Sequence, residues 1–262
     1  MTGPDPAAYF VRVAPHRFLP TRHTSGAWSE TEQHVSPLAG LVVHEIERHA
    51  AAASGDDGKV ISRVTFDILG VVAIEELEIE VTTLRPGRTV ELVEAVVTSG
   101  PRTVLRARAW RLATTDTSSV AGGAAPPIPF ALPAWPMTSV WPGGYIASLD
   151  VRRHPDSSAG RAVVWVDTSV TLVEAEQVST LARYVGLVDT ANGIGVRESP
   201  DEWLFPNLDL SVHLHRQPGE GPVGLDTTVV FGPDGRGLTS SILHDGSGPV
   251  GLATQILTVR PR

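Results

Sequence analysis

The chain has 262 residues, of which 42% are hydrophobic and 19% are charged, the proportions of an ordinary globular protein. Its net charge of −8 argues against nucleic acid or an anionic membrane as the main partner, and the absence of cysteine excludes disulfides and thiolate nucleophiles. No apolar run approaches the roughly 20 residues that span a bilayer, and the N-terminal segment has no basic stretch followed by an apolar one, so we expect a cytoplasmic protein.

The first part of the chain has the pattern of one helix followed by four strands. After an extended segment at 9–20, Ser36 and Pro37 form an N-cap and first-turn pair, and apolar residues then recur at helical spacing. This spacing predicts a helix over 37–53. Alternating apolar and polar residues, interrupted at glycine and proline, then predict four strands, at 60–69, 76–84, 89–99 and 102–112.

The middle of the chain, residues 114–144, is rich in proline. Its six prolines exclude a regular helix or a central strand. The segment is nevertheless too apolar for a free linker, because it contains Trp135 and Trp141 among other large side chains. We therefore expect it to lie extended across the surface, as a connector between an N-terminal unit at 1–113 and a C-terminal unit at 145–262.

The second part repeats the order of the first. Extended segments at 145–151 and 161–166 precede a helix that Ser179 can cap and that Asn192 and Gly193 close. Four strands follow, at 207–216, 224–231, 234–245 and 248–261, and the Gly-containing turn at 234–237 is typical of a hairpin. The repeat indicates an internal duplication. One helix wrapped by an antiparallel sheet, present twice and joined edge to edge, is an α+β double hotdog.

Six segments in this order resemble the acyl-CoA thioesterase II (TesB-like) family. They are AWSETEQHVSPLAGLVVHEIERH at 27–49, VISRVTFDIL at 60–69, IEVTTLRPGRTVELVEAVV at 79–97, LRARAWRL at 105–112, NLDLSVHLHR at 207–216 and GPVGLATQILTVRP at 248–261. No single segment is highly specific, but the ordered set covers nearly the whole chain. The resemblance implies a double hotdog that hydrolyses acyl-CoA and acts in lipid metabolism.

Two polar side chains interrupt apolar strands of the second part. Asp209 and Gln255 lie on different strands of one predicted sheet, and a carboxylate and an amide so placed can hold a water for hydrolysis without a Ser or Cys nucleophile. A solvent-facing polar stripe is the alternative for Asp209, and a backbone-capping amide is the alternative for Gln255. The resemblance matches both residues to the family's catalytic Asp and Gln. The family's third catalytic residue is a Thr. Thr228 is the candidate for it here, if the alignment is shifted by an even number of residues, which keeps the same face of the strand.

Gln33 and His34 come just before the first predicted helix. Unpaired backbone N–H groups and the helix dipole favour negative charge there, so we expect both residues to bind substrate where the thioester carbonyl is polarised. An ordinary capping loop is the alternative. His213 and His215 have a spacing that can bind metal, but an exposed polar strand face is the simpler interpretation.

Several catalytic motifs are missing from the sequence. There is no G-x-S-x-G elbow, no glycine pattern of a Rossmann or P-loop site, and no hydratase-type run. We therefore predict hydrolysis of acyl-CoA or a related acyl thioester by a water that an Asp and a Gln orient, without metal or redox cofactor. A non-catalytic acyl-CoA or lipid-binding protein with a degenerate hotdog site is the alternative. Since closed symmetric dimers are the commonest assembly, we expect a homodimer or a larger homo-oligomer.

Overall fold

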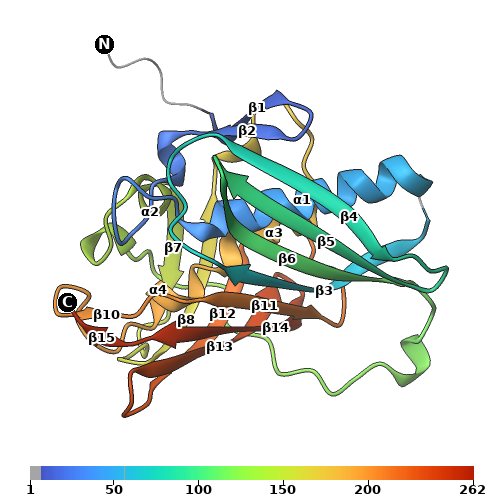
Figure 1. The fold of residues 1–262 in the computed structure, drawn as a ribbon. Helices are drawn as coiled ribbons and strands as arrows, with labels where there is room; N and C mark the ends of the chain where they lie inside the picture. The colour runs from blue at the N-terminus through green and yellow to red at the C-terminus, as the bar shows by residue number, and fades with distance from the viewer. Residues whose placement is uncertain (1–6, 56) are drawn as a thin grey trace.

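The structure is a computed structural model that describes residues 7–55 and 57–262. Within them a sheet of thirteen strands curves around two central helices, α1 and α3 (Figure 1). The elements of the first part are β1 (Ala8–Ala14), β2 (Arg17–Pro20), η1 (Arg22–Thr24), α1 (Val35–Ser54), β3 (Lys59–Ile68), β4 (Leu77–Arg85), β5 (Val90–Ser99) and β6 (Arg102–Ala113).

The remaining elements include several short helices. After η2 (Ser118–Val120) and η3 (Met137–Ser139) come α2 (Gly144–Ala147), β7 (Leu149–Arg153), β8 (Arg161–Thr168), β9 (Thr171–Val173), α3 (Thr180–Val188) and α4 (Ala191–Ile194). The chain ends with β10 (Trp203–Leu204), β11 (Asp209–Leu214), β12 (Val223–Phe231), β13 (Arg236–Asp245), β14 (Gly248–Thr258) and β15 (Arg260–Pro261). No helix of the described ranges is both long enough and apolar enough to cross a membrane.

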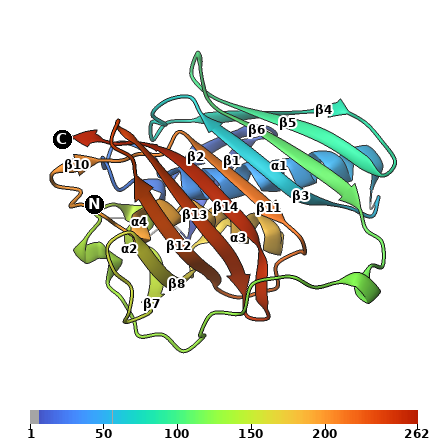
Figure 2. The same cartoon turned by 90° about the horizontal axis from the view of Figure 1, so that it is seen from below.

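The strand order is symmetric about the centre of the sheet. Outward from the centre, the first part contributes β3, β6, β5, β4, β2 and β1, and the second part contributes β11, β14, β13, β12, β8 and β7. The thirteenth strand, β9 of the second part, departs from this symmetry because it pairs in parallel with β1 at the edge of the first series. The antiparallel pair of β3 and β11 joins the two series, with Val64 opposite Val212 (Figure 2). The double hotdog predicted from the sequence is therefore confirmed.

The two helices pack against each other inside the curved sheet. A Cβ atom at Gly40 of α1 would lie 2.7 Å from the carbonyl oxygen of Ala182 and 2.8 Å from Cα of Gly186, so the backbones meet without an intervening side chain. The apolar face of α1 is fully buried, and α3 is buried over most of its length. This close crossing fixes the start of α1 beside the end of α3.

Two local features differ from the expected elements. Tyr145 lies in the helical turn α2 rather than in an extended segment, because this turn packs closely on η1: the Tyr145 amide donates to the Ser25 carbonyl, and Gly144 has no room for a side chain against the Arg22 carbonyl. The second central helix ends at Val188, and a separate short helix, α4, follows it.

The connector crosses the C-terminal series of strands as an extended segment (Figure 2). The indole N–H of Trp165 on β8 donates to the carbonyl of Pro129, and the Phe130 ring packs on the Trp165 ring with centroids 5.0 Å apart. The amide of Trp135 donates to the carbonyl of Val151 on β7. Main-chain and aromatic contacts thus hold a segment whose prolines prevent regular structure.

Candidate active site

A buried carboxylate lies at the end of α3. Oδ1 of Asp189 accepts a hydrogen bond from Nε2 of Gln255 and another from Nδ2 of Asn207, each at 2.8 Å. Oδ2 lies 3.7 Å from Nδ1 of His34. The four residues come from the end of α3, the inner face of β14, the loop before β11 and the start of α1. The helix crossing and the curved sheet therefore bring together side chains from both halves of the chain.

The surroundings of Asp189 change its acidity. Only 4% of the residue is exposed, and this loss of hydration raises its pKa to about 7. The bonds from Asn207 and Gln255 oppose the shift, whereas the nearby charge of Asp209 adds to it. A carboxylate with a pKa near neutral pH is suited to take a proton from water as a general base.

His34 is the N-cap residue of α1. Its Nδ1 accepts a hydrogen bond from the Ser36 amide at 3.1 Å, and burial lowers the pKa of the imidazole to about 3. The ring is therefore neutral and carries its proton on Nε2. It packs against the ring of Tyr145 with centroids 4.3 Å apart, which fixes its plane. His34 is thus neutral, with its acceptor nitrogen Nδ1 near the Asp189 carboxylate and its hydrogen-bond donor on Nε2.

Two adjoining cavities surround Asp189. The larger has a volume of about 330 Å³, and its wall combines Asp189, Gln33 and Asn207 with apolar side chains such as Ile68 and Leu208. The smaller has a volume of about 30 Å³. Both are lined by the same five residues, Ala27, Trp28, His34, Asp189 and Asn207. Asp189 therefore lines both a cavity of ligand size and a small cavity that can hold water.

The predicted residues fall into two groups. Gln255 points inward and binds Asp189, and both His34 and Gln33 line the larger cavity. The side-chain amide of Gln33 donates to the Ala73 carbonyl, which holds it in the cavity wall. These positions are compatible with the predicted roles in substrate binding.

Asp209 and Thr228 do not join this group. The inward residues of β11 are Leu210 and its alternate neighbours, so Asp209 lies on the outer face, where its carboxylate accepts the Ile256 amide at 2.6 Å. Thr228 is exposed on β12, and its inward neighbour Thr227 bonds Ser241. The expected set of Asp209, Gln255 and Thr228 is thus not brought together, because alternation along the strands places Asp209 and Thr228 on the face opposite Gln255.

Sequence reasoning missed Asp189 and Asn207. Asp189 directly follows the apolar helix α3, and Asn207 lies two residues before Asp209 in the same resembling segment. The available signal was a single acidic residue directly after a buried helix. It has an equally good interpretation as an ordinary helix end, since the C-cap position tolerates many residue types.

The N-terminal half has an equivalent of Gln255. Val64 and Val212 face each other at the centre of the sheet, and their partners on the next strands are Ala109 and Ala253. Two residues further along, also pointing inward, are Arg111 and Gln255. The duplicated fold therefore places a guanidinium where the other half has an amide.

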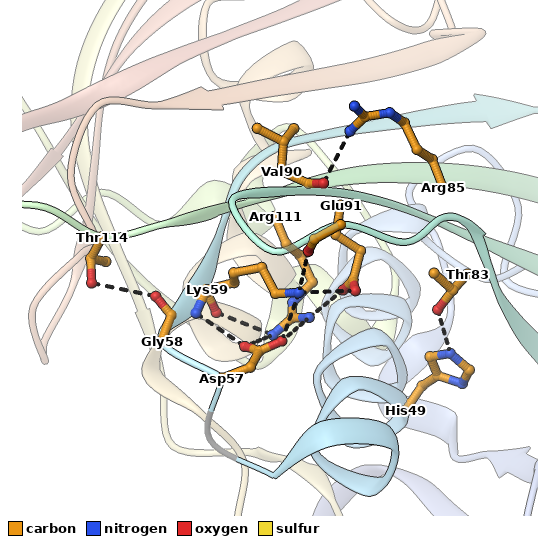
Figure 3. A network of polar contacts seen from close by, with 11 residues as sticks. His49, Asp57, Gly58, Lys59, Thr83, Arg85, Val90, Glu91, Arg111 and Thr114 are labelled. Carbon is orange, nitrogen blue, oxygen red and sulfur yellow. Dashed lines mark hydrogen bonds and ion pairs between the residues drawn. The ribbon is translucent and has the colours of Figure 1, made fainter.

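Ion pairs fill the position around Arg111 (Figure 3). Arg111 bonds Asp57 at 2.8 Å and also bonds Glu91, while Nζ of Lys59 lies 3.0 Å from Asp57 and 3.1 Å from Glu91. Two cations and two carboxylates thus neutralise one another. Both of these carboxylates have cationic partners, whereas Asp189 is held by two neutral amides.

Fold and site together define a hotdog protein with a buried carboxylate as its candidate base. Residues 24–112 match the acyl-CoA thioesterase N-terminal domain family, and residues 124–259 match the acyl-CoA thioesterase C-terminal domain family. The chain belongs to this family of acyl-CoA thioesterases, enzymes that hydrolyse acyl thioesters. No curated protein is significantly similar to it in sequence.

Solved structures share the fold across nearly the whole chain. A protein of Thermobifida fusca is 22% identical, with a TM-score of 0.67 over 99% of this chain and 100% of the other. The acyl-CoA thioesterase II from Mycobacterium marinum is 14% identical, with a TM-score of 0.68 over 98% and 96%. A hotdog protein from Alicyclobacillus acidocaldarius is 12% identical, with a TM-score of 0.73 over 98% and 97%. At such identities the likeness concerns the fold.

Proposed function

We propose that the protein hydrolyses acyl-CoA with a water molecule for which Asp189 is the general base. One observation carries the proposal: a buried carboxylate with a pKa near 7 has one oxygen bound by two amides, and its other oxygen lies beside the cavities. Gln255 and Asn207 hold the carboxylate without neutralising it. Oδ2 then accepts the proton of the attacking water.

The step balances without another reactant. The water oxygen bonds to the thioester carbon while its proton passes to Asp189, and the carbonyl oxygen becomes an oxyanion. Nε2–H of the neutral His34 and the Val35 amide in the first turn of α1 are the donors for this oxyanion, since the Ser36 amide binds Nδ1 of His34 and Pro37 has no N–H. When the carbon–sulfur bond breaks, Asp189 returns the proton to the departing thiolate, and the products are a carboxylic acid and free CoA.

The larger cavity supports an amphipathic acyl-CoA as the substrate. Its apolar side, formed by Trp28, Ile68, Val72 and Leu208 among others, offers contact surface to the acyl group. Arg260 lies on the same wall and carries a positive charge suited to the phosphates of CoA. A binding site that joins an apolar wall, a carboxylate base and a cation matches the three parts of this substrate.

The test is the substitution Asp189→Asn, which keeps the shape of the side chain and an oxygen that can accept both amides. We expect thiol release from acyl-CoA to fall about 10²–10⁴-fold, the usual cost of losing a positioned base. Acyl-CoA binding, measured by calorimetry, should change little.

Asp209→Asn is the matched control because Asp209 is the outward carboxylate nearest in sequence to the site. This variant should keep its turnover. Full activity of Asp189→Asn, or loss of activity only in Asp209→Asn, would overturn the proposal. A wild-type protein that binds acyl-CoA but releases no thiol would instead be a binding protein with a degenerate site.

A further inference from the structure

Asn192 has an unsatisfied oxygen next to the candidate base. It lies on α4, three residues after Asp189, and is 7% exposed. Its Nδ2 donates to the carbonyl of Phe205 at 3.0 Å, and this carbonyl can only accept, so the orientation of the amide is fixed. Among the residues described, Oδ1 of Asn192 has no hydrogen-bond partner. A buried acceptor of this kind is costly unless something donates to it.

The small cavity offers Asn192 such a donor. Its volume of about 30 Å³ exceeds the roughly 10–15 Å³ that a cavity needs to hold a water. Asn192 lines it together with Asp189, His34 and Asn207, so that several polar residues surround the space. A single water there can donate one hydrogen to the Asp189 carboxylate and the other to Oδ1 of Asn192.

The rear wall of this cavity is tightly closed. Trp141 donates from its indole N–H to the carbonyl of Gly193 at 2.8 Å, and a Cβ atom at Gly193 would lie 3.1 Å from Cε of Met137. Both Met137 and Trp141 come from the end of the connector and are almost fully buried. The cavity therefore has room for a water, and on the side of Trp28 it adjoins the larger cavity, which the same residue lines.

We infer that Asn192 is a further catalytic residue, the second acceptor that orients the attacking water. This inference rests on the proposed function of Asp189. When both hydrogens of the water are bound, its lone pairs are directed away from Asp189 and Asn192, towards the larger cavity where the thioester carbon is placed. The proton passes to Asp189, because an amide oxygen is far too weak a base to take it at neutral pH.

Two variants of Asn192 test the role. Asn192→Ala should lower kcat about 10²-fold, the cost of a reactant misplaced by about 1 Å, with little change in KM. Asn192→Asp places a second buried carboxylate near Asp189, and like charges raise the pKa of one of the pair. The rise of kcat with pH should therefore move to higher pH in Asn192→Asp, which checks that residue 192 faces Asp189, while the fall in kcat at unchanged KM in Asn192→Ala checks the catalytic role.

Thr227→Val is the matched control for lost stability. Thr227 is fully buried on the inner face of β12, and its hydroxyl is hydrogen-bonded to that of Ser241 at 2.7 Å. This variant should lower the Tm by an amount similar to Asn192→Ala while keeping kcat. Wild-type kcat in Asn192→Ala would overturn the inference, as would an equal loss of kcat in Thr227→Val. An inactive Asp189→Asn beside a fully active Asn192→Ala would refute the role of Asn192 alone, whereas an active Asp189→Asn would refute the proposed function itself.

Discussion

Gln255 and Arg111 occupy equivalent positions in the two halves of the sheet, yet they bind carboxylates in opposite ways. The amide of Gln255 donates to Asp189 without adding charge, so burial can raise the pKa of that carboxyl to about 7. The guanidinium of Arg111 pairs with Asp57 and Glu91. This guanidinium and the ammonium of Lys59 lower the pKa of Glu91 despite its burial. At this pair of equivalent positions, the carboxylate held by the amide is therefore the one suited to act as a base at neutral pH.

The pKa of Asp189 predicts how activity depends on pH. Because the base acts when ionised, kcat/KM for acyl-CoA should rise with pH through about 7 and then level off. The charge of Asp209 contributes to the raised pKa of Asp189, so Asp209→Asn should shift the rise to lower pH while keeping the plateau. Thiol release measured from pH 5 to pH 9 checks both; a profile that is flat around pH 7 contradicts the assignment.

The same pKa predicts a stability cost. The pKa of Asp189 is raised in the folded protein above its ordinary value of 3.8, so folding retains a proton that the unfolded chain releases, and stability falls as pH rises from about 4 to about 7. Asp189→Asn removes this cost, up to about 4 kcal/mol at 1.36 kcal/mol for each pKa unit. Its Tm should exceed that of the wild type at pH 8 and approach it near pH 4. If the Tm difference between Asp189→Asn and the wild type is the same at pH 8 and pH 4, folding does not raise the pKa of Asp189.

The ion-pair cluster predicts a different effect in the N-terminal half. Arg111→Met removes one cation from Asp57 and Glu91 and leaves Lys59 paired with both. We expect a loss of about 3 kcal/mol, at the lower end for breaking a buried pair because one cation remains. Urea unfolding measures the loss, and the double variant Arg111→Met, Glu91→Met should lose less. Since Arg111 lies outside the site, kcat should not change; a large fall in kcat would mean that this half also takes part in the reaction.

The helix crossing predicts a reversal of the usual effect of Gly→Ala in a helix. Alanine normally stabilises a helix by about 0.5–1 kcal/mol relative to glycine. At Gly40 the added methyl would meet the backbone of α3 at 2.7 Å, so we expect Gly40→Ala to destabilise by about 1–3 kcal/mol. It should also lower kcat, because separating the helices widens the 3.7 Å approach of His34 to Asp189.

The control for Gly40→Ala is Gly246→Ala, where the new methyl has no neighbour within 4 Å. This variant should match the wild type in both Tm and kcat. If Gly40→Ala is as stable as Gly246→Ala, the crossing has room to adjust and the close packing of the two helices does not position the site.

The sequence by itself determined the elements and their duplication. Alternation along strands and helical spacing are local properties, and they placed α1 and the strands of both halves within a few residues of their observed bounds. Gln255 could be found in the same way, because an amide at an inward position between Ala253 and Leu257 breaks a local pattern.

Only the tertiary structure decided which carboxylate belongs to the site. Asp209 was the acidic residue that interrupted a strand pattern. It occupies one of the outward positions of β11, however, and there its carboxylate accepts a backbone amide. Asp189 interrupts no pattern, since it simply follows the buried helix α3. It becomes a candidate base because the close crossing at Gly40 and Gly186 holds the ends of two helices together, and the curvature of the sheet brings Asn207 and Gln255 over them. Because those contacts join residues far apart in the chain, no local pattern in the sequence indicates them.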